Sequence, residues 1–274
     1  MSVLQEGIPD DEPTVWETRD GRAWTRASLA MDGQPVTGVA HGGRGYVAVR
    51  SDAGGQELWH AADGRTFSRA FALPVGSAVI SLAGGPEGFV AIVADTTAEY
   101  ASTIYASGDG IGWYEAEGGP AEVRAVSALG PDWVAVAPGP FEDYSVRADT
   151  PAWFSTNGLD WTETGAIPLI AVALDESTSC REFIFDAIGT GGQVVVSTTF
   201  SYPCGEGRVQ TFGRSSISSD GARWARLPFT ESSVAVDRAT RGATVTSGIE
   251  LETGTLLVGE KDYRAAFWWR PADR

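Results

Sequence analysis

Ser155-Thr156-Asn157-Gly158-Leu159-Asp160-Trp161 is the clearest copy of a pattern that recurs along this chain. Each copy has a small residue, a variable residue, Asp or Asn, Gly, two variable residues and an aromatic residue. The other copies are residues 18–24, 61–67, 107–113 and 218–224. The copies follow one another at intervals of 43, 46, 48 and 63 residues, the last of which carries an insertion. A short motif repeated in this way is typical of a repeat protein, and a repeat decides the fold before weaker signals are considered.

The motif itself predicts a hairpin. Asp-Gly or Asn-Gly between two β-rich runs favours a two-residue type I′ turn, because both central residues then need positive φ. The aromatic residue at the end of each copy, such as Trp113 or Trp161, is expected to start the second strand. There it would pack against a neighbouring sheet and bury a large apolar surface.

A second pattern precedes each hairpin. In residues 36–50 two β-rich runs flank Gly42-Gly43-Arg44-Gly45, which predicts two further strands joined by a tight turn. Each repeat is therefore expected to form four antiparallel strands in meander order. Consecutive units of this kind predict an all-β chain that folds as a β-propeller. An open β-solenoid and a two-sheet sandwich are the alternatives.

The number of repeats predicts five blades in one domain, residues 1–274. Residues 268–273 align with residues 15–20, and the chain ends where a further hairpin strand would begin. Residues 22–29 are expected to supply that strand, so that the N-terminal strand joins the C-terminal blade and closes the ring. Residues 14–19 are then left over, and a sixth, incomplete blade is the competing count.

Composition excludes several classes of partner. The formal net charge is −16 and the pI is about 4.5, whereas nucleic acids and anionic membranes both attract cationic surfaces. No apolar run is long enough to cross a membrane, and residues 1–13 are too acidic for a signal peptide. We expect a monomer that binds neither nucleic acid nor membrane.

Cys180 and Cys204 are the only cysteines. Both are expected in connections above the fourth blade, which favours a disulfide and a secreted or otherwise extracytoplasmic protein. Two free thiols in a cytoplasmic protein are the alternative. His41 and His60 have no further ligands at usable spacing, so the sequence predicts no metal site and no cofactor.

The long connections fall on one face of the predicted propeller, here called the top face. Long loops on a rigid scaffold commonly carry function, so a small molecule, a glycan or a protein is expected to bind there or at the channel mouth. The candidate ligand-binding residues combine charged and aromatic side chains. They are Arg50, Asp95, Arg124, Tyr144, Arg181, Glu182, Tyr202 and Glu260.

The repeated motif resembles the Asp-box, the bacterial neuraminidase repeat of sialidase-type β-propellers. Residues 155–161 and 218–224 carry the resemblance, which extends over nearly the whole chain as a periodic pattern. The family motif usually has one extra residue between Asp and Gly. The resemblance implies a structural hairpin on the face away from the active site, and no catalytic residue is carried over.

Two functions follow from this interpretation. The preferred one is a non-catalytic binding or interaction module, because no catalytic motif is present. The alternative is a glycoside hydrolase, either sialidase-like or of the five-bladed arabinanase and invertase kind, which uses carboxylates at the channel mouth. Asp95, Glu182 and Glu260 are its candidate acid, base or nucleophile.

Overall fold

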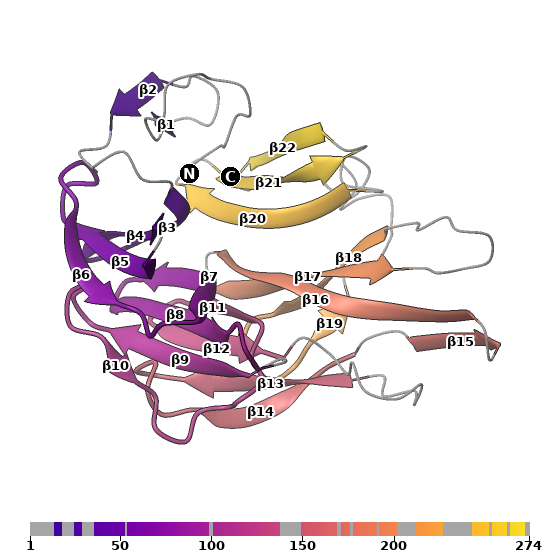
Figure 1. Ribbon diagram of the computed structural model, residues 1–274. Coiled ribbons are helices and arrows are strands. Elements are labelled where there is room, and N and C mark those ends of the chain that lie inside the picture. Colours follow the sequence, from indigo (N-terminus) through magenta and orange to yellow (C-terminus); the bar gives the residue numbers. More distant parts are fainter. Residues whose placement is uncertain are drawn as a thin grey trace. The chain divides into compact units, whose positions relative to one another are not determined.

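The computed structural model consists of β-strands (Figure 1). It describes residues 14–17, 25–28, 36–52, 54–98, 101–137, 149–168, 171–175, 178–190, 192–201, 212–226, 243–251, 254–261 and 264–271. These ranges contain no helix, so the prediction of an all-β chain is confirmed for them.

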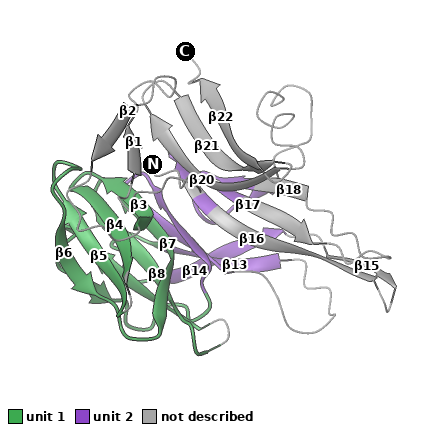
Figure 2. Cartoon of the chain, turned by 45° about the horizontal axis from the view of Figure 1, so that its top comes forward, with its two compact units in different colours: residues 1–122, 155–161 green, residues 123–154, 162–274 purple. Residues whose placement is uncertain are grey.

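The chain divides into two compact units (Figure 2). The first consists of residues 1–122 and 155–161, and the second of residues 123–154 and 162–274. A single domain over residues 1–274 stays a prediction.

The first unit contains two four-stranded sheets in which the hydrogen-bonded order follows the chain. One sheet consists of β3 (Val36–Gly42), β4 (Gly45–Asp52), β5 (Gly55–Ala61) and β6 (Ser68–Ala72). The other consists of β7 (Ser77–Gly85), β8 (Gly88–Asp95), β9 (Ser102–Ser107) and β10 (Tyr114–Glu115). All neighbouring strands are antiparallel, which confirms the meander predicted for one repeat.

The first copy of the motif joins a separate pair of strands. β1 (Thr14–Glu17) pairs antiparallel with β2 (Thr25–Ser28) and forms a two-stranded sheet. Residues 25–28, within the expected strand of residues 22–29, thus form a strand, and among the described strands its partner is β1. The number of blades and the way the ring closes stay predictions.

The second unit contains three sheets, again in chain order. The first consists of β11 (Ala125–Leu129), β12 (Asp132–Val136), β13 (Asp149–Ser155, of which Ser155 belongs to the first unit) and β14 (Thr162–Pro168). The next consists of β15 (Ala171–Asp175), β16 (Thr178–Thr190), β17 (Gln193–Ser201), β18 (Phe212–Ser218) and β19 (Ala225–Arg226). The last consists of β20 (Ala243–Leu251), β21 (Gly254–Lys261) and β22 (Arg264–Pro271).

β15 corrects one prediction. Cys180 was expected in a connection above the fourth blade, not in a strand. Instead Ala171–Asp175 forms a strand that pairs with β16, and Cys180 lies within β16 opposite Val172. The second sheet of this unit therefore has five strands.

The largest core cluster of each unit lies between two of its sheets. In the first unit Val47 and Val49 of β4 and Leu58 of β5 pack in one cluster with Phe89 and Trp113. Val47 and Val49 are two residues apart, so their side chains lie on the same face of β4. Alternation places one face of β4 and β5 in this cluster and the other face in a second cluster. The second cluster consists of Val36, Ala48, Ala61 and Phe67, with Val39, Tyr46 and Trp59 packed against it.

In the second unit Val134, Val136, Ala152, Ile167 and Val194 form the centre of the core. Phe154 and Trp224 pack against it, together with further small buried residues. Trp224 is the aromatic residue of the last motif copy, so this part of the motif contributes to the core as predicted.

Neighbouring sheets of a unit contact each other through equivalent strands, which are the first strands of their sheets except in the five-stranded sheet, where β16 is the second. β3 contacts β7 in the first unit, while β11 contacts β16 and β16 contacts β20 in the second (Figure 1). At the end of β3 and β7 the backbones approach closely, and the Gly43 N–H donates a hydrogen bond to the Gly85 carbonyl at 2.9 Å. This arrangement is the one expected of neighbouring propeller blades.

Candidate functional site

Four loops that carry the repeated motif share one structure and are called the box loops. They are residues 62–67, 108–113, 156–161 and 219–224, each between two antiparallel strands. They are longer than the two-residue turn predicted from Asp-Gly, and the aromatic residue directly precedes the second strand rather than starting it. The hairpins themselves are confirmed.

Side-chain acceptors explain the longer loop. In the second box loop Asp109 Oδ1 accepts hydrogen bonds from the backbone N–H groups of Ile111 and Gly112, both at 2.8 Å. Ser107 Oγ accepts the Gly110 N–H at 2.9 Å. The carboxylate therefore takes the place of a backbone acceptor, as in an Asx turn, and the chain needs no type I′ geometry.

The indole N–H groups of Trp113 and Trp161 donate to equivalent acceptors. Trp113 Nε1 donates to the Gly110 carbonyl at 3.2 Å, and Trp161 Nε1 donates to the Gly158 carbonyl at 2.8 Å. In the last copy the Gly221 carbonyl accepts the Thr164 hydroxyl instead, at 3.0 Å. Trp224 Nε1 is buried and has no hydrogen-bond partner within the described part of the chain.

The box carboxylates make stability depend on pH. Hydrogen bonds from backbone N–H groups lower the pKa values of Asp63, Asp109 and Asp220 below the usual value. A carboxylate with a lowered folded-state pKa stabilises the fold above its unfolded-state pKa of about 3.9, and this contribution is lost as the pH falls through the folded-state pKa.

We therefore expect the urea midpoint to fall as the pH drops below about 4. A triple variant with Asn at Asp63, Asp109 and Asp220 should show a shallower acid decline, because Asn keeps the Oδ1 acceptor without a titrating proton. Urea titrations at several pH values measure both curves. If the urea midpoints of wild type and the triple variant fall equally as the pH is lowered, the expectation is contradicted.

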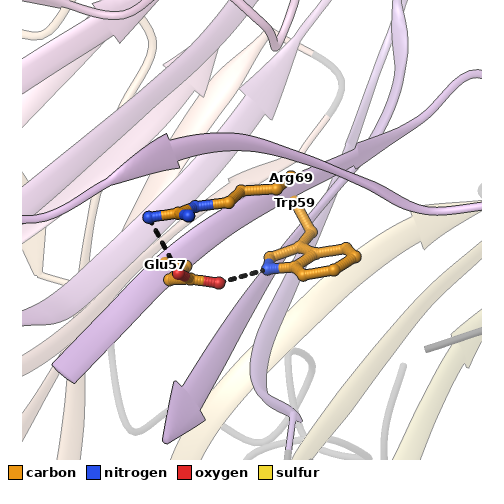
Figure 3. Close-up of polar contacts among 3 residues, drawn as sticks. All are labelled: Glu57, Trp59 and Arg69. Atoms are coloured by element: carbon orange, nitrogen blue, oxygen red, sulfur yellow. Dashed lines mark hydrogen bonds and ion pairs between the residues drawn. The ribbon is translucent and has the colours of Figure 1, made fainter. Parts of the chain in front are cut away.

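A cluster of polar and aromatic side chains lies on one face of the first sheet (Figure 3). Glu57 accepts the Trp59 indole N–H at 3.0 Å and forms an ion pair with Arg69 at 3.0 Å. The Arg50 guanidinium lies 4.7 Å from the centroid of the Trp59 ring. Arg50 lies opposite Glu57 in the pairing of β4 with β5, and Trp59 lies opposite Arg69 in the pairing of β5 with β6. Glu57 and Trp59 are two residues apart on β5, so all four side chains lie on the same face of the sheet.

Arg50 is thus a predicted site residue that the structure places beside other functional groups. It is half-buried, and its buried Nε has no hydrogen-bond partner among the residues that the structure describes. Glu57, Trp59 and Arg69 were not among the predicted site residues. Glu57 and Trp59 could have been grouped from their spacing, because residues two apart on a strand share a face.

Glu57 is expected to contribute more to stability than Arg69. Its side chain is 17% exposed, whereas that of Arg69 is 57% exposed. Glu57→Ala leaves the Trp59 indole N–H without its acceptor and should lower the free energy of unfolding by about 1–3 kcal/mol. Arg69→Ala removes only a surface ion pair and should cost less than about 1 kcal/mol. Urea unfolding compares the two variants, and equal losses would contradict this ranking.

Asp95 does not join this cluster, and Arg124 belongs to the second unit. Both side chains are exposed. Asp95 Oδ1 accepts the Thr97 N–H at 2.8 Å and the Thr97 hydroxyl at 2.6 Å, and these bonds lower the pKa of Asp95. Asp95 therefore holds a local turn.

The remaining predicted residues are placed by their backbone or lie outside the described ranges. Arg181 and Glu182 lie in β16, where Arg181 pairs with Ser201 and Glu182 with Phe200. Glu260 lies in β21 and pairs with Thr244. Tyr144, Tyr202 and Cys204 lie outside the described residues, so the disulfide with Cys180 and the extracytoplasmic location stay predictions.

In the described ranges no three His, Cys, Asp or Glu residues gather into a group that could hold a metal ion. None of the described segments forms an apolar helix long enough to span a membrane.

Comparison with known proteins relies on structure alone. No protein-family model matches the chain, and no curated protein sequence matches it. The α-L-arabinanase of Penicillium chrysogenum, solved with arabinobiose, is 12% identical with a TM-score of 0.52, over 86% of this chain and 78% of that one.

Two further structures are similar. The β-propeller domain of the Trilobed protease from Pyrococcus furiosus is 12% identical with a TM-score of 0.50, over 96% of this chain and 73% of that domain. A glycosyl hydrolase from Bacteroides ovatus is 12% identical with a TM-score of 0.45, over 98% of this chain and 94% of that one. The first two likenesses, with the antiparallel four-stranded sheets, support a β-propeller fold.

Proposed function

We propose that this chain is a carbohydrate-active β-propeller that hydrolyses glycosidic bonds, the alternative raised by its sequence. The observation that carries the proposal is the likeness of its fold to an arabinanase over 86% of the chain. Fold does not by itself imply function, so hydrolysis also requires side chains that could perform the reaction.

Glycoside hydrolysis commonly needs two carboxyl groups, one of them protonated when the leaving group departs. Asp95 does not suit the acid, because the Thr97 donors lower its pKa and a general acid needs a raised one. Glu182 and Glu260 are the remaining carboxylates of the predicted set. Both lie on strands of the second unit, in β16 and β21.

The topology favours this pair. Glu182 lies near the start of β16, and Glu260 pairs with Thr244 near the start of β20. β16 and β20 contact each other and hold equivalent positions, because each pairs across a short turn with the next strand of its sheet, β17 or β21. Strands in equivalent positions of adjacent propeller blades run in the same direction. The proposal therefore places both glutamates towards the same end of the second unit. Separations of about 5–5.5 Å or about 6.5–9.5 Å between the carboxyl groups correspond to retention or inversion.

A substrate screen tests the proposal. The full chain is incubated with arabinan, other plant and bacterial polysaccharides and a set of chromogenic glycosides, and new reducing ends are measured. Release of sugar from any of them supports hydrolysis. A glycan array run in parallel separates the second candidate, a binding module. Binding on the array with no turnover of that glycan would reject hydrolysis.

A further inference from the structure

The third box loop differs from the other three at two linked positions. It has Asn157 where the others have Asp63, Asp109 and Asp220, and three residues later it has Asp160. The corresponding residues of the other described box loops are Thr66, Gly112 and Arg223, none of which is acidic.

The two differences compensate each other. Asn157 Nδ2 donates a hydrogen bond to Asp160 Oδ2 at 2.7 Å. Asn157 Oδ1 accepts the backbone N–H groups of Leu159 and Asp160 at 2.8 and 2.9 Å, which fixes the orientation of the amide. An aspartate at position 157 would place two carboxylates in contact, and like charges this close repel each other.

Asn157 is followed by Gly158, and Asn-Gly is a chemically labile pair. Asparagine is a thermolabile residue, and glycine has no side chain to hinder approach of its nitrogen to the preceding amide. In deamidation the deprotonated Gly158 nitrogen attacks Asn157 Cγ, the bond to Nδ2 breaks and ammonia leaves. Water then opens the resulting succinimide to aspartate or isoaspartate.

The closed box loop opposes the first step. Gly158 is buried, and its N–H is donated to Ser155 Oγ at 2.8 Å, so the attacking nitrogen is shielded and keeps its proton. The amide is held by its own bonds to Ser155 Oγ, Leu159, Asp160 and the Asp160 carboxylate. The donors to Oδ1 polarise Cγ, but attack also requires the side chain to rotate out of these bonds.

We propose that Asn157-Gly158 is a deamidation site that the closed box loop protects and that becomes reactive when this hairpin opens. Opening exposes the Gly158 nitrogen and frees the Asn157 amide in one event, because the same loop holds both. Deamidation then places a carboxylate beside Asp160, or adds a backbone methylene as isoaspartate. Either product opposes reclosure, so the modification marks chains in which the loop has opened.

Peptide mapping by mass spectrometry tests the proposal on the full chain at mildly alkaline pH. Native protein should deamidate at Asn157 at least about tenfold more slowly than the same chain in urea, since protection scales with the free energy of opening. Ser155→Ala removes the acceptor of the Gly158 N–H and should accelerate deamidation in the folded protein. Thr156→Ala, at the exposed neighbouring position, is the matched control and should keep the wild-type rate.

Equal rates in native and urea-unfolded protein would overturn the proposal, as would a folded Ser155→Ala variant with the wild-type rate. If circular dichroism shows that Ser155→Ala does not fold, the comparison of native with unfolded wild type still decides. A second pair of variants tests the compensation. Asn157→Asp should lower the urea midpoint, and adding Asp160→Asn should restore it. No recovery in the double variant would show that Asp160 does not oppose the product.

Discussion

Gly84→Ala is expected to destabilise the first unit by about 3 kcal/mol, the upper part of the range for overpacking. Gly84 lies near the end of β7, and an alanine Cβ there would fall on the backbone carbonyl of His41 in β3. The Gly42 nitrogen would lie 3.0 Å from the same Cβ. Backbone atoms cannot rotate away as a side chain can, so the two strands would have to separate.

Separation would also break the hydrogen bond from Gly43 to Gly85, which joins the turns of the two sheets. Gly84 does not have a left-handed backbone conformation, so the effect measures the contact and not backbone strain. Urea unfolding of the variant and of wild type gives the change in free energy.

Gly108→Ala is the matched control. The nearest atom to a Cβ at Gly108 is the Glu87 carbonyl oxygen at 4.0 Å, and the residue is exposed. Its free energy of unfolding should stay within about 0.5 kcal/mol of wild type, as for surface substitutions. Equal midpoints for Gly84→Ala and Gly108→Ala would show that β3 and β7 are not packed backbone to backbone.

The strands on both sides of this contact could be predicted from the sequence. Gly42 and Gly43, or Gly84 and Gly85, marked the turns and ends of strands, and apolar runs on both sides marked the strands themselves. Both signals are local. The antiparallel meander follows from them because short connections make consecutive strands neighbours.

The box loops show where local signals were insufficient. Asp-Gly indicated a turn correctly, but its length depends on which group satisfies the backbone N–H donors. Asp109 Oδ1 accepts two of them, and Ser107 Oγ accepts that of Gly110. Ser107, the small residue at the start of the motif, is thus a hydrogen-bonding partner of the loop. The Asp-Gly dipeptide taken alone favours a shorter turn.

β15 and the cluster at Trp59 escaped prediction for different reasons. Residues 169–174 form an apolar run, which is itself a strand signal, but the repeat model left no place for an additional strand. The side chains of Arg50, Glu57, Trp59 and Arg69 gather on one face of the sheet because three strands are in register. Register depends on the turns and bulges between strands, including the shift between Leu58 and Trp59, and composition does not specify it.

Glu182→Gln and Glu260→Gln are each expected to lower kcat/KM on a polysaccharide substrate by roughly 10²–10⁴-fold, the usual contribution of a general acid or base. Gln keeps the size of the side chain and removes the carboxylate. The measurement is the rate of reducing-end release by each variant and by wild type. Asp95→Asn is the control, because Asn keeps the Oδ1 acceptor of the turn at Thr97, and it should keep the wild-type rate.

The two glutamates should differ in a second measurement. The general acid has to be protonated, so its replacement should abolish the decline of activity at high pH that its deprotonation causes. The same variant should lose little activity on a chromogenic glycoside, whose leaving group needs no proton. Loss of the base or nucleophile should affect both substrates equally. If both variants hydrolyse the polysaccharide at the wild-type rate, this carboxylate pair is wrong, even where the screen itself has detected turnover.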